Sequence, residues 1–196
     1  MPGPLAILVR LHDRAFGAVE ATLASWAPGL LARASFAAVL LGYFWNAAQT
    51  KIGEGPLGFL SISDGAYFQI VPPVVEAYGY DASAVPFLPW GLIVTVGTWA
   101  EFLLPALIVL GLATRLAALG MIVFVVVQSW VDIAFHGADA ATIGALFDRN
   151  PGSVILDQRA LWVFLLVYLA VKGAGALSLD ALLRRRFGDA PAAARA

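Results

Sequence analysis

The chain has 196 residues, of which 61% are apolar and 13% charged, whereas ordinary soluble domains have about 45–50% apolar and about 25% charged residues. So few charges cannot cover a globule of this size with polar surface, which favours a membrane protein over a soluble one. The sequence has no cysteine, which excludes disulfides, thiolate metal sites and a dithiol relay within the chain, so redox chemistry would need a bound cofactor or a partner. The net charge of -1 provides no basic field for nucleic acid, which we do not expect as a partner.

Residues 1–29 predict an amphipathic helix that lies on the membrane surface. Apolar residues recur there at steps of three and four with charged residues between them, which places the two kinds on opposite faces of a helix. Pro28 and Gly29 are expected to end this helix before the chain turns into the bilayer. The apolar residues are Leu5, Leu8, Phe16, Val19, Leu23 and Trp26.

Four later segments are long and apolar enough to span a bilayer, whose hydrocarbon core requires about 20 helical residues. They lie near 32–50, 91–113, 116–135 and 160–178. The sequence therefore predicts an all-α integral membrane four-helix bundle over residues 30–180. The lipid bilayer is its expected partner, and assembly into a homo-oligomer stays open.

The topology of the bundle follows from its shortest connection and from its basic flanks. Only Thr114 and Arg115 separate the second and third segments, which predicts a tight antiparallel hairpin. Because cytoplasmic loops carry an excess of Lys and Arg, we expect both termini on the cytoplasmic side of a bacterial inner membrane. The expected cytoplasmic flanks contain Arg10, Arg14, Arg33, Arg115, Arg184, Arg185, Arg186 and Arg195, and the outer flanks contain Lys51, Arg149 and Arg159.

The segments outside the bundle are predicted to be partly structured. The loop 51–90 is too apolar for a free linker, so we expect a cap over the bundle with short helices near 63–71 and 73–79. The second outer loop is expected to contain a short helix at 139–147.

The chain after the fourth span is predicted to be a basic cytoplasmic tail, 181–196. It begins within a short helix expected over 179–187, for which Ser178 lies at a capping position. Three arginines in this helix are expected to bind anionic lipid headgroups, namely Arg184, Arg185 and Arg186.

Glu101 is the most informative polar residue, because it lies near the middle of the second span. An ionised carboxylate there costs at least about 2.5–3.5 kcal/mol, so its charge must be compensated or the group must be protonated. Counting from the Thr114–Arg115 turn places Gln128 at the same depth on the third span. Asp132 and His136 continue outward from Gln128 on the same helix face, at steps of four residues.

These positions predict a polar ligand pocket in the outer half of the bundle. Asn46 and Lys51 reach it from the first span, and Trp99 and Trp130 are placed to enclose a flat ring such as a quinone, with Glu101 as a proton carrier. The same polar groups could instead serve only as interhelical hydrogen bonds, each contributing about 0.6–2 kcal/mol. The predicted pocket comprises Asn46, Lys51, Trp99, Glu101, Gln128, Trp130 and Asp132.

Other kinds of site find little support in the sequence. No metal site is predicted, and Asp132 and His136 are only weak candidates for ligands. A glycine-rich phosphate loop, an HExxH motif and a nucleophile elbow are absent from the sequence, so an autonomous hydrolase is not supported.

Three short motifs carry a resemblance to a known family. They are Gly97–Glu101 (GTWAE), Gly111–Ala118 (GLATRLAA) and Lys172–Asp180 (KGAGALSLD). Through them, and through the first span with Arg33, the chain resembles the DoxX family of four-helix membrane proteins over most of Arg33 to Asp180. The residues that match the motifs of this family are Arg33, Glu101, Arg115 and Asp180.

The resemblance implies an inner-membrane protein that serves as the membrane subunit of a redox-linked system; its cofactor stays open, with a quinone as one candidate. If the chain is an enzyme at all, it would then be a subunit of a membrane oxidoreductase. Two alternatives stay open. One is a non-catalytic anchor or maturation partner of an extracytoplasmic protein or a copper-binding modified peptide, and the other is a transporter of a small solute or a metal.

Overall fold

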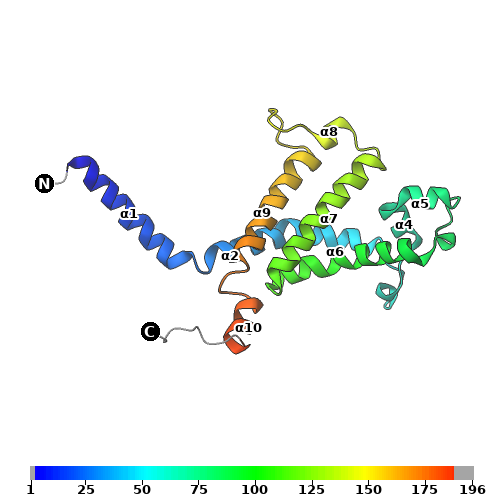
Figure 1. Cartoon of the computed structure of the whole chain (residues 1–196), viewed down its shortest axis with the longest axis horizontal. Coiled ribbons are helices and arrows are strands. Elements are labelled where there is room, and N and C mark those ends of the chain that lie inside the picture. The colour runs from blue at the N-terminus through cyan, green and yellow to red at the C-terminus, as the bar shows by residue number, and fades with distance from the viewer. Residues whose placement is uncertain (1–2, 188–196) are drawn as a thin grey trace.

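A computed structural model describes residues 3–187, which fold into a series of helices joined by short loops (Figure 1). An isolated antiparallel bridge between Ile52 and Ile62 supplements the helices. In chain order the helices are α1 (Pro4–Leu23), α2 (Ala27–Phe36), α3 (Gly42–Gln49), α4 (Asp64–Ile70), α5 (Pro72–Ala77), α6 (Leu92–Leu110), α7 (Thr114–Ala134), α8 (Ala140–Ile143), α9 (Arg159–Lys172) and α10 (Leu179–Phe187).

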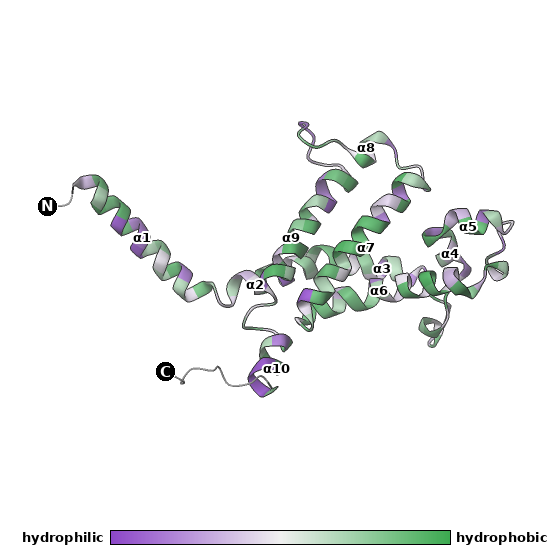
Figure 2. Cartoon of the chain, in the orientation of Figure 1, coloured by the Kyte–Doolittle hydropathy of each residue, from purple (hydrophilic) through white to green (hydrophobic). Residues whose placement is uncertain are grey.

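Four helical runs are long and apolar enough to cross a bilayer, which confirms the predicted all-helical fold with four candidate membrane spans. Three of them contain a π-helical turn, at Ala37–Leu41 between α2 and α3, before α6 and before α9. Figure 2 shows their apolar surface as nearly continuous green over α6, α7 and α9. The four runs are Ala27–Gln49, Phe87–Leu110, Thr114–Ala134 and Val154–Lys172.

The span boundaries differ from the predicted ones by several residues, and the backbone explains each shift. Pro28 does not end a helix but lies in the first turn of α2, where its missing N–H would have no partner in any case. The second span ends at Leu110, since Gly111 takes a left-handed conformation with φ 69°. The fourth span ends at Lys172 instead of 178, because Gly173 follows with φ 80°.

The spans pack as a bundle in which α7 contacts both α6 and α9, and α6 also contacts α3. α2 lies between α6 and α9 at the end where α6 turns into α7, which we call the hairpin end. From there the α3–α6 pair and the α7–α9 pair diverge toward the opposite end, the cap end (Figure 1). The buried core includes Phe36, Phe44, Ile108, Met121 and Leu166.

The loop 51–90 forms a cap that packs on the side of α6. As predicted, it contains two short helices, α4 and α5. A second buried cluster joins the cap to the bundle, because Ala66 of α4 and Val75 of α5 pack with Val94 of α6. The predicted helix at 139–147 is shorter than expected and covers only Ala140–Ile143.

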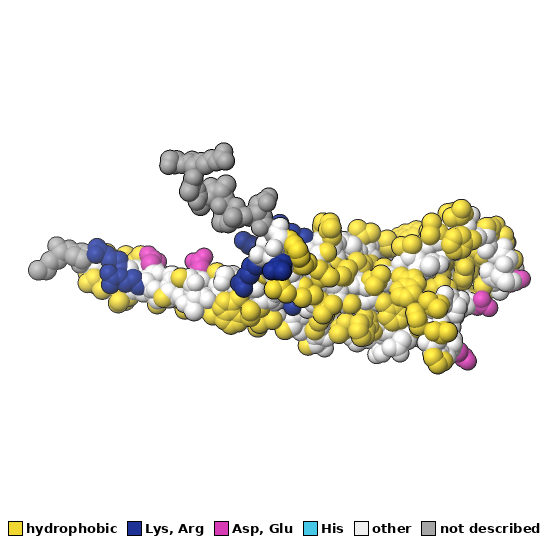
Figure 3. Space-filling model, turned by 90° about the horizontal axis from the view of Figure 1, so that it is seen from below, with side chains coloured by type: hydrophobic (Ala, Val, Ile, Leu, Met, Phe, Trp, Pro, Cys, Tyr) yellow, Lys and Arg dark blue, Asp and Glu magenta, His cyan; other side chains and the backbone are white. Residues whose placement is uncertain are grey.

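Charge is distributed unevenly along the long axis of the molecule. Figure 3 shows Lys and Arg side chains on α1 and beside α10, whereas Asp and Glu side chains are visible both on α1 and at the opposite end. α1 extends away from the bundle and buries none of its residues against it (Figure 1). Residues 188–196 of the predicted basic tail lie outside the described residues, and the part that is described forms α10.

Candidate functional site

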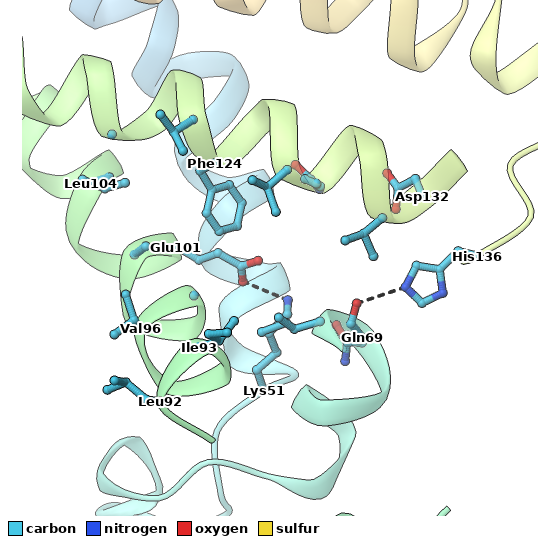
Figure 4. Close-up of a pocket in the computed structure, with 18 residues that line it drawn as sticks. Lys51, Gln69, Leu92, Ile93, Val96, Glu101, Leu104, Phe124, Asp132 and His136 are labelled. Atoms are coloured by element: carbon cyan, nitrogen blue, oxygen red, sulfur yellow. Dashed lines mark hydrogen bonds and ion pairs between the residues drawn. The ribbon is translucent and has the colours of Figure 1, made fainter. Parts of the chain in front are cut away.

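A cavity of about 590 Å³ lies between α6 and α7. Its volume falls in the range of typical small-molecule sites, about 300–1,000 Å³. α4 closes it at the cap end, where Gln69 and Ile70 line the wall (Figure 4). Most of the wall is apolar, and the lining residues that can form ionic or side-chain hydrogen bonds are Lys51, Gln69, Glu101, Gln128, Asp132 and His136.

A buried ion pair compensates the charge of Glu101. The Nζ atom of Lys51 lies 2.8 Å from Oε2 of Glu101, and each side chain keeps only 6% of its surface exposed. Lys51 follows the last turn of α3, whose carbonyl at Ala47 accepts a second hydrogen bond from Nζ at 3.0 Å. The sequence placed Lys51 near the pocket but did not identify it as the partner of Glu101.

The pair still presents free hydrogen-bonding capacity to the cavity. A lysine ammonium has three N–H donors, of which Ala47 and Glu101 take two. Glu101 binds Lys51 through one oxygen, and Figure 4 shows its second oxygen beside the ring of Phe124, away from Lys51. One donor and one acceptor are therefore available to a ligand at the same point of the wall.

His136 and Gln69 close the cap end of the cavity. Nε2 of His136 lies 3.0 Å from the backbone carbonyl oxygen of Gln69, so the end of α7 is tied to α4 (Figure 4). Among residues 3–187 no group of three or more His, Asp or Glu side chains is arranged to hold a metal ion.

Asp132 lines the cavity, but its charge is already compensated by another helix. Its Oδ2 atom accepts a hydrogen bond of 2.6 Å from Arg159 of α9, whose other Nη donates to Ser129 at 2.9 Å. Arg159, predicted as a flanking charge of the outer loop, lies near the start of the fourth span, and only 5% of its side chain is exposed. Both acidic residues of the cavity thus have a basic partner.

Three residues of the predicted pocket lie outside the cavity or only at its edge. Asn46 is exposed on α3 and does not line the cavity. Trp99 packs against Phe59 and Phe102 instead of a ligand site. Trp130 is 59% exposed, with its ring against Phe135, so neither tryptophan encloses the cavity.

The depth assigned to Gln128 was also wrong by about one helical turn. The hairpin turns at Gly111–Ala113, before Thr114, so α7 begins earlier than the predicted turn implied. Glu101 consequently lies beside Phe124, and Gln128 lies farther toward the cap end (Figure 4). Gln128 lines the cavity and donates to the hydroxyl of Tyr43 at 2.9 Å, which joins α7 to the first span.

Arg33, singled out from the sequence, has a structural role at the hairpin end. Only 8% of its surface is exposed, and its guanidinium donates to the carbonyls that end α6, including Val109 at 2.8 Å. It also donates to Leu177 at 2.6 Å in the loop after α9. One side chain thereby connects three of the four spans, and its positive charge lies at the negative end of the α6 dipole.

Asp180 completes the same connection from the other side. Its carboxylate accepts hydrogen bonds from the backbone N–H groups of Ala113 at 2.7 Å and Thr114 at 2.9 Å, at the start of α7. Its own N–H donates to Gly111 at 2.8 Å. A Cβ on Gly111 would lie 2.7 Å from Ser178, so only glycine fits this contact. Asp180 therefore caps a helix that has no capping side chain of its own.

We expect Asp180→Ala to reduce stability by about 1 kcal/mol at neutral pH, within the range of lost helix caps. Burial alone would raise the pKa of Asp180, but the hydrogen bonds from Thr114 and Ala113 outweigh it and lower this pKa below 3.8. The stabilisation by the carboxylate is thus complete above pH 3.8 and is lost as the pH falls through the lowered pKa.

Thermal unfolding of both proteins in mild detergent, recorded between neutral pH and pH 3, tests this expectation. The difference in Tm should shrink at the acidic end, whereas Asp13→Asn on the exposed α1 should leave Tm unchanged throughout. A difference that stays constant to the lowest pH would contradict the capping role.

The remaining basic residues singled out from the sequence lie at the hairpin end. Arg115 is in the first turn of α7 and is exposed, beside Gly173. Arg184, Arg185 and Arg186 are exposed on α10, where Ser178 caps the helix through a 3.1 Å bond from the N–H of Ala181. Their predicted binding to anionic lipids stays a prediction.

Comparison with known proteins adds no identification. No family model, no curated protein and no solved structure matches the chain.

Proposed function

We propose that the chain is the membrane subunit of a redox-linked system and binds a quinone in the cavity between α6 and α7. The observation that carries this proposal is the composition of the wall, which is apolar except for paired or neutral polar groups. Apolar cavities with a few fixed polar groups are typical of sites for small hydrophobic ligands. The DoxX-like motifs of the sequence point in the same direction.

The charges of the cavity favour a ligand whose polar head is uncharged. Lys51 is paired with Glu101, and Asp132 with Arg159, so no unpaired charge on the wall would attract a phosphate or an ammonium group. A neutral ring with carbonyl or hydroxyl groups fits the remaining donor on Lys51 and the free oxygen of Glu101. These two residues would hold a quinone head, which supplies the reversible uptake of electrons and protons when bound.

Glu101 is the residue in this site that can exchange a proton with the ligand. Its free oxygen faces the cavity, and Lys51 stabilises its ionised form at 2.8 Å. A hydroxyl of the ligand head could transfer a proton to this oxygen. Lys51 would hold the ligand in position by donating a hydrogen bond to a neighbouring oxygen of the head. Because this chain contains no cysteine for a dithiol relay, electron transfer to or from the ligand would need a further bound cofactor or a partner protein.

The charge asymmetry supports a proposed location and orientation. The arginines at the hairpin end, including those of α10, agree with both termini on the cytoplasmic side of a bacterial inner membrane (Figure 3). The cavity would then open toward the outer face of that membrane.

Ligand binding is tested by native mass spectrometry of the protein released from lipid nanodiscs loaded with a quinone. We expect a quinone adduct on the wild type and its loss in the double variant Lys51→Met/Glu101→Met, which removes both charges at once and so preserves the fold. The matched control is Thr98→Val, since Thr98 is buried one turn away on α6 and does not line the cavity. An adduct that persists in the double variant, or that is missing from the wild type, would refute the quinone site.

A second candidate function is the docking of an extracytoplasmic protein or copper-binding peptide, and exposed apolar groups at the cap end favour it. Phe147 is fully exposed between α8 and α9, and Leu146 beside it is 57% exposed. Crosslinking from position 147 in cells should capture a discrete partner if this function holds. Capture of further copies of the chain itself would indicate a homo-oligomer instead.

A further inference from the structure

We infer that a second pocket, at the hairpin end of the bundle, binds the phosphate group of an anionic membrane lipid. This pocket has a volume of about 300 Å³ and lies between the start of α7, the loop after α9 and α10. We call it the hairpin pocket. It shares no lining residue with the cavity between α6 and α7, so the inference does not depend on the proposed quinone site.

Two arginines from different helices line the hairpin pocket. Arg115 comes from the first turn of α7, and Arg184 comes from α10. A Cβ atom on Gly173 would lie 3.4 Å from Nε of Arg115, so the side chain of Arg115 extends over the end of α9. Among residues 3–187 neither guanidinium forms an ion pair, which leaves both charges available to a ligand.

The acidic residue of the hairpin pocket does not neutralise its positive charge. Asp180 lines the pocket, but its two carboxylate oxygens already accept hydrogen bonds from the N–H groups of Ala113 and Thr114. With two arginines and one aspartate, the wall keeps an excess of one positive charge. Guanidinium groups bind phosphate oxygens through paired hydrogen bonds, so a phosphate is the anion that suits this wall.

Apolar residues of the same pocket favour a lipid over a soluble phosphate. Leu116 of α7 is 73% exposed and Leu183 of α10 is 42% exposed, and both line the pocket. Leu116 lies within the candidate span Thr114–Ala134, so its exposed side chain can contact acyl chains. Basic pockets at the ends of membrane spans are typical sites for anionic lipid headgroups. A lipid would bind the arginines through its phosphate and contact the leucines through its glycerol and acyl groups.

The hairpin pocket distinguishes among the three arginines of α10. The sequence predicts lipid binding for Arg184, Arg185 and Arg186 alike, and all three are exposed beside the bundle (Figure 3). Of these three, only Arg184 lines the pocket. A lipid in the pocket would contact α7 and α10 at once, so its affinity should depend on which arginine is changed and not on the net charge alone.

Four single variants test this dependence on position. Arg115→Gln and Arg184→Gln each remove one positive charge from the wall of the pocket. Arg185→Gln and Arg186→Gln are the matched controls, because they remove the same charge from exposed positions of α10 outside the pocket. None of the four arginines forms an ion pair within residues 3–187, so we expect all four variants to have the Tm of the wild type without added lipid.

Binding is measured by native mass spectrometry of delipidated protein in mild detergent, titrated with phosphatidylglycerol or with phosphatidylcholine of the same acyl chains. The wild type should bind one phosphatidylglycerol more tightly than phosphatidylcholine, whose ammonium group the arginines repel. Arg115→Gln and Arg184→Gln should each weaken phosphatidylglycerol about five- to tenfold, and the controls should weaken it less than about twofold. Glycerol phosphate, which has no acyl chain, should not displace the lipid at equal concentration.

Several outcomes would overturn the inference. Equal weakening by all four variants would do so, because diffuse attraction to a basic surface does not depend on which arginine is removed. Equal affinity of the wild type for the two lipids, or no effect of Arg115→Gln and Arg184→Gln, would contradict it as well. Displacement of the lipid by glycerol phosphate at equal concentration would show that the pocket takes soluble phosphates, and the assignment to a lipid would be wrong.

Discussion

Replacing Arg33 by alanine is expected to lower the free energy of unfolding by at least about 3 kcal/mol. A hydrogen bond from a charged donor contributes about 1.5–3 kcal/mol, and Arg33 donates to carbonyls at the end of α6 and in the loop after α9. The variant leaves these buried acceptors without a partner. The measurement is a titration with sodium dodecyl sulfate in mild detergent, followed by circular dichroism.

Two further variants show whether the geometry of the guanidinium matters or only its charge. Arg33→Lys should recover only part of the loss, because one ammonium cannot reach Val109 and Leu177 together as the guanidinium fork does. Arg185→Ala, which removes an exposed arginine of α10, should leave the titration unchanged. If Arg33→Ala unfolds at the same detergent concentration as Arg185→Ala, the bonds in the structure do not stabilise the protein.

The second large effect concerns the buried pair. Lys51→Met and Glu101→Met are each expected to lower the free energy of unfolding by about 3–5 kcal/mol, because each leaves one buried charge without its partner. The double variant should lose much less than the sum, since two methionines of similar volume replace the pair with apolar groups. The four titration curves form a double-mutant cycle that isolates the coupling between the two residues.

The outcome of this cycle also distinguishes a pair from two separate polar groups. Additive losses would mean that Lys51 and Glu101 are compensated independently, for example by water in the cavity. The matched pair for comparison is Asp132 with Arg159, which is also buried but has Ser129 as an additional partner of the arginine. Its cycle should show a smaller coupling, because 30% of the Asp132 side chain remains exposed.

The fold could be predicted from the sequence because lipid imposes strong constraints on it. Backbone groups in a bilayer must be paired within a helix, so each long apolar run indicates one span. The span boundaries were predicted less accurately, because the conformation of a single residue sets each of them. Gly111 ends α6 in a left-handed conformation, and Pro28, which was expected to end a helix, lies in the first turn of α2.

The site could be predicted only at positions where placing a polar group in the membrane carries a large energetic penalty. A carboxylate at mid-membrane indicates a polar site by itself, and Glu101 indeed lines the cavity. Asn46 and Trp99 were assigned to the predicted pocket from their expected depth in the membrane alone. Depth does not determine which face of a helix points to the cavity. For this reason Asn46 is exposed and Trp99 packs against other aromatic rings.

The contacts of Arg33 and Arg159 could not be predicted for a different reason. A basic residue at the edge of a span has the same sequence pattern whether it contacts water or turns inward. Arg159 pairs with Asp132, which lies on a different helix, α7. Arg33 donates only to backbone carbonyls, and these cannot be recognised as partners in a sequence. The packing of the helices determines these contacts, and residue spacing in the sequence does not show how the helices pack.

The connection at the hairpin end also determines when the bundle can be completed during synthesis. Arg33 belongs to the first span, but its acceptor Leu177 and the helix cap Asp180 lie far later in the chain. While the ribosome is still making α9, α7 has no cap and Arg33 lacks part of its partners. A nascent chain stopped before Leu177 lacks both contacts, so we expect membrane proteases to cleave it far more readily than one released after α10.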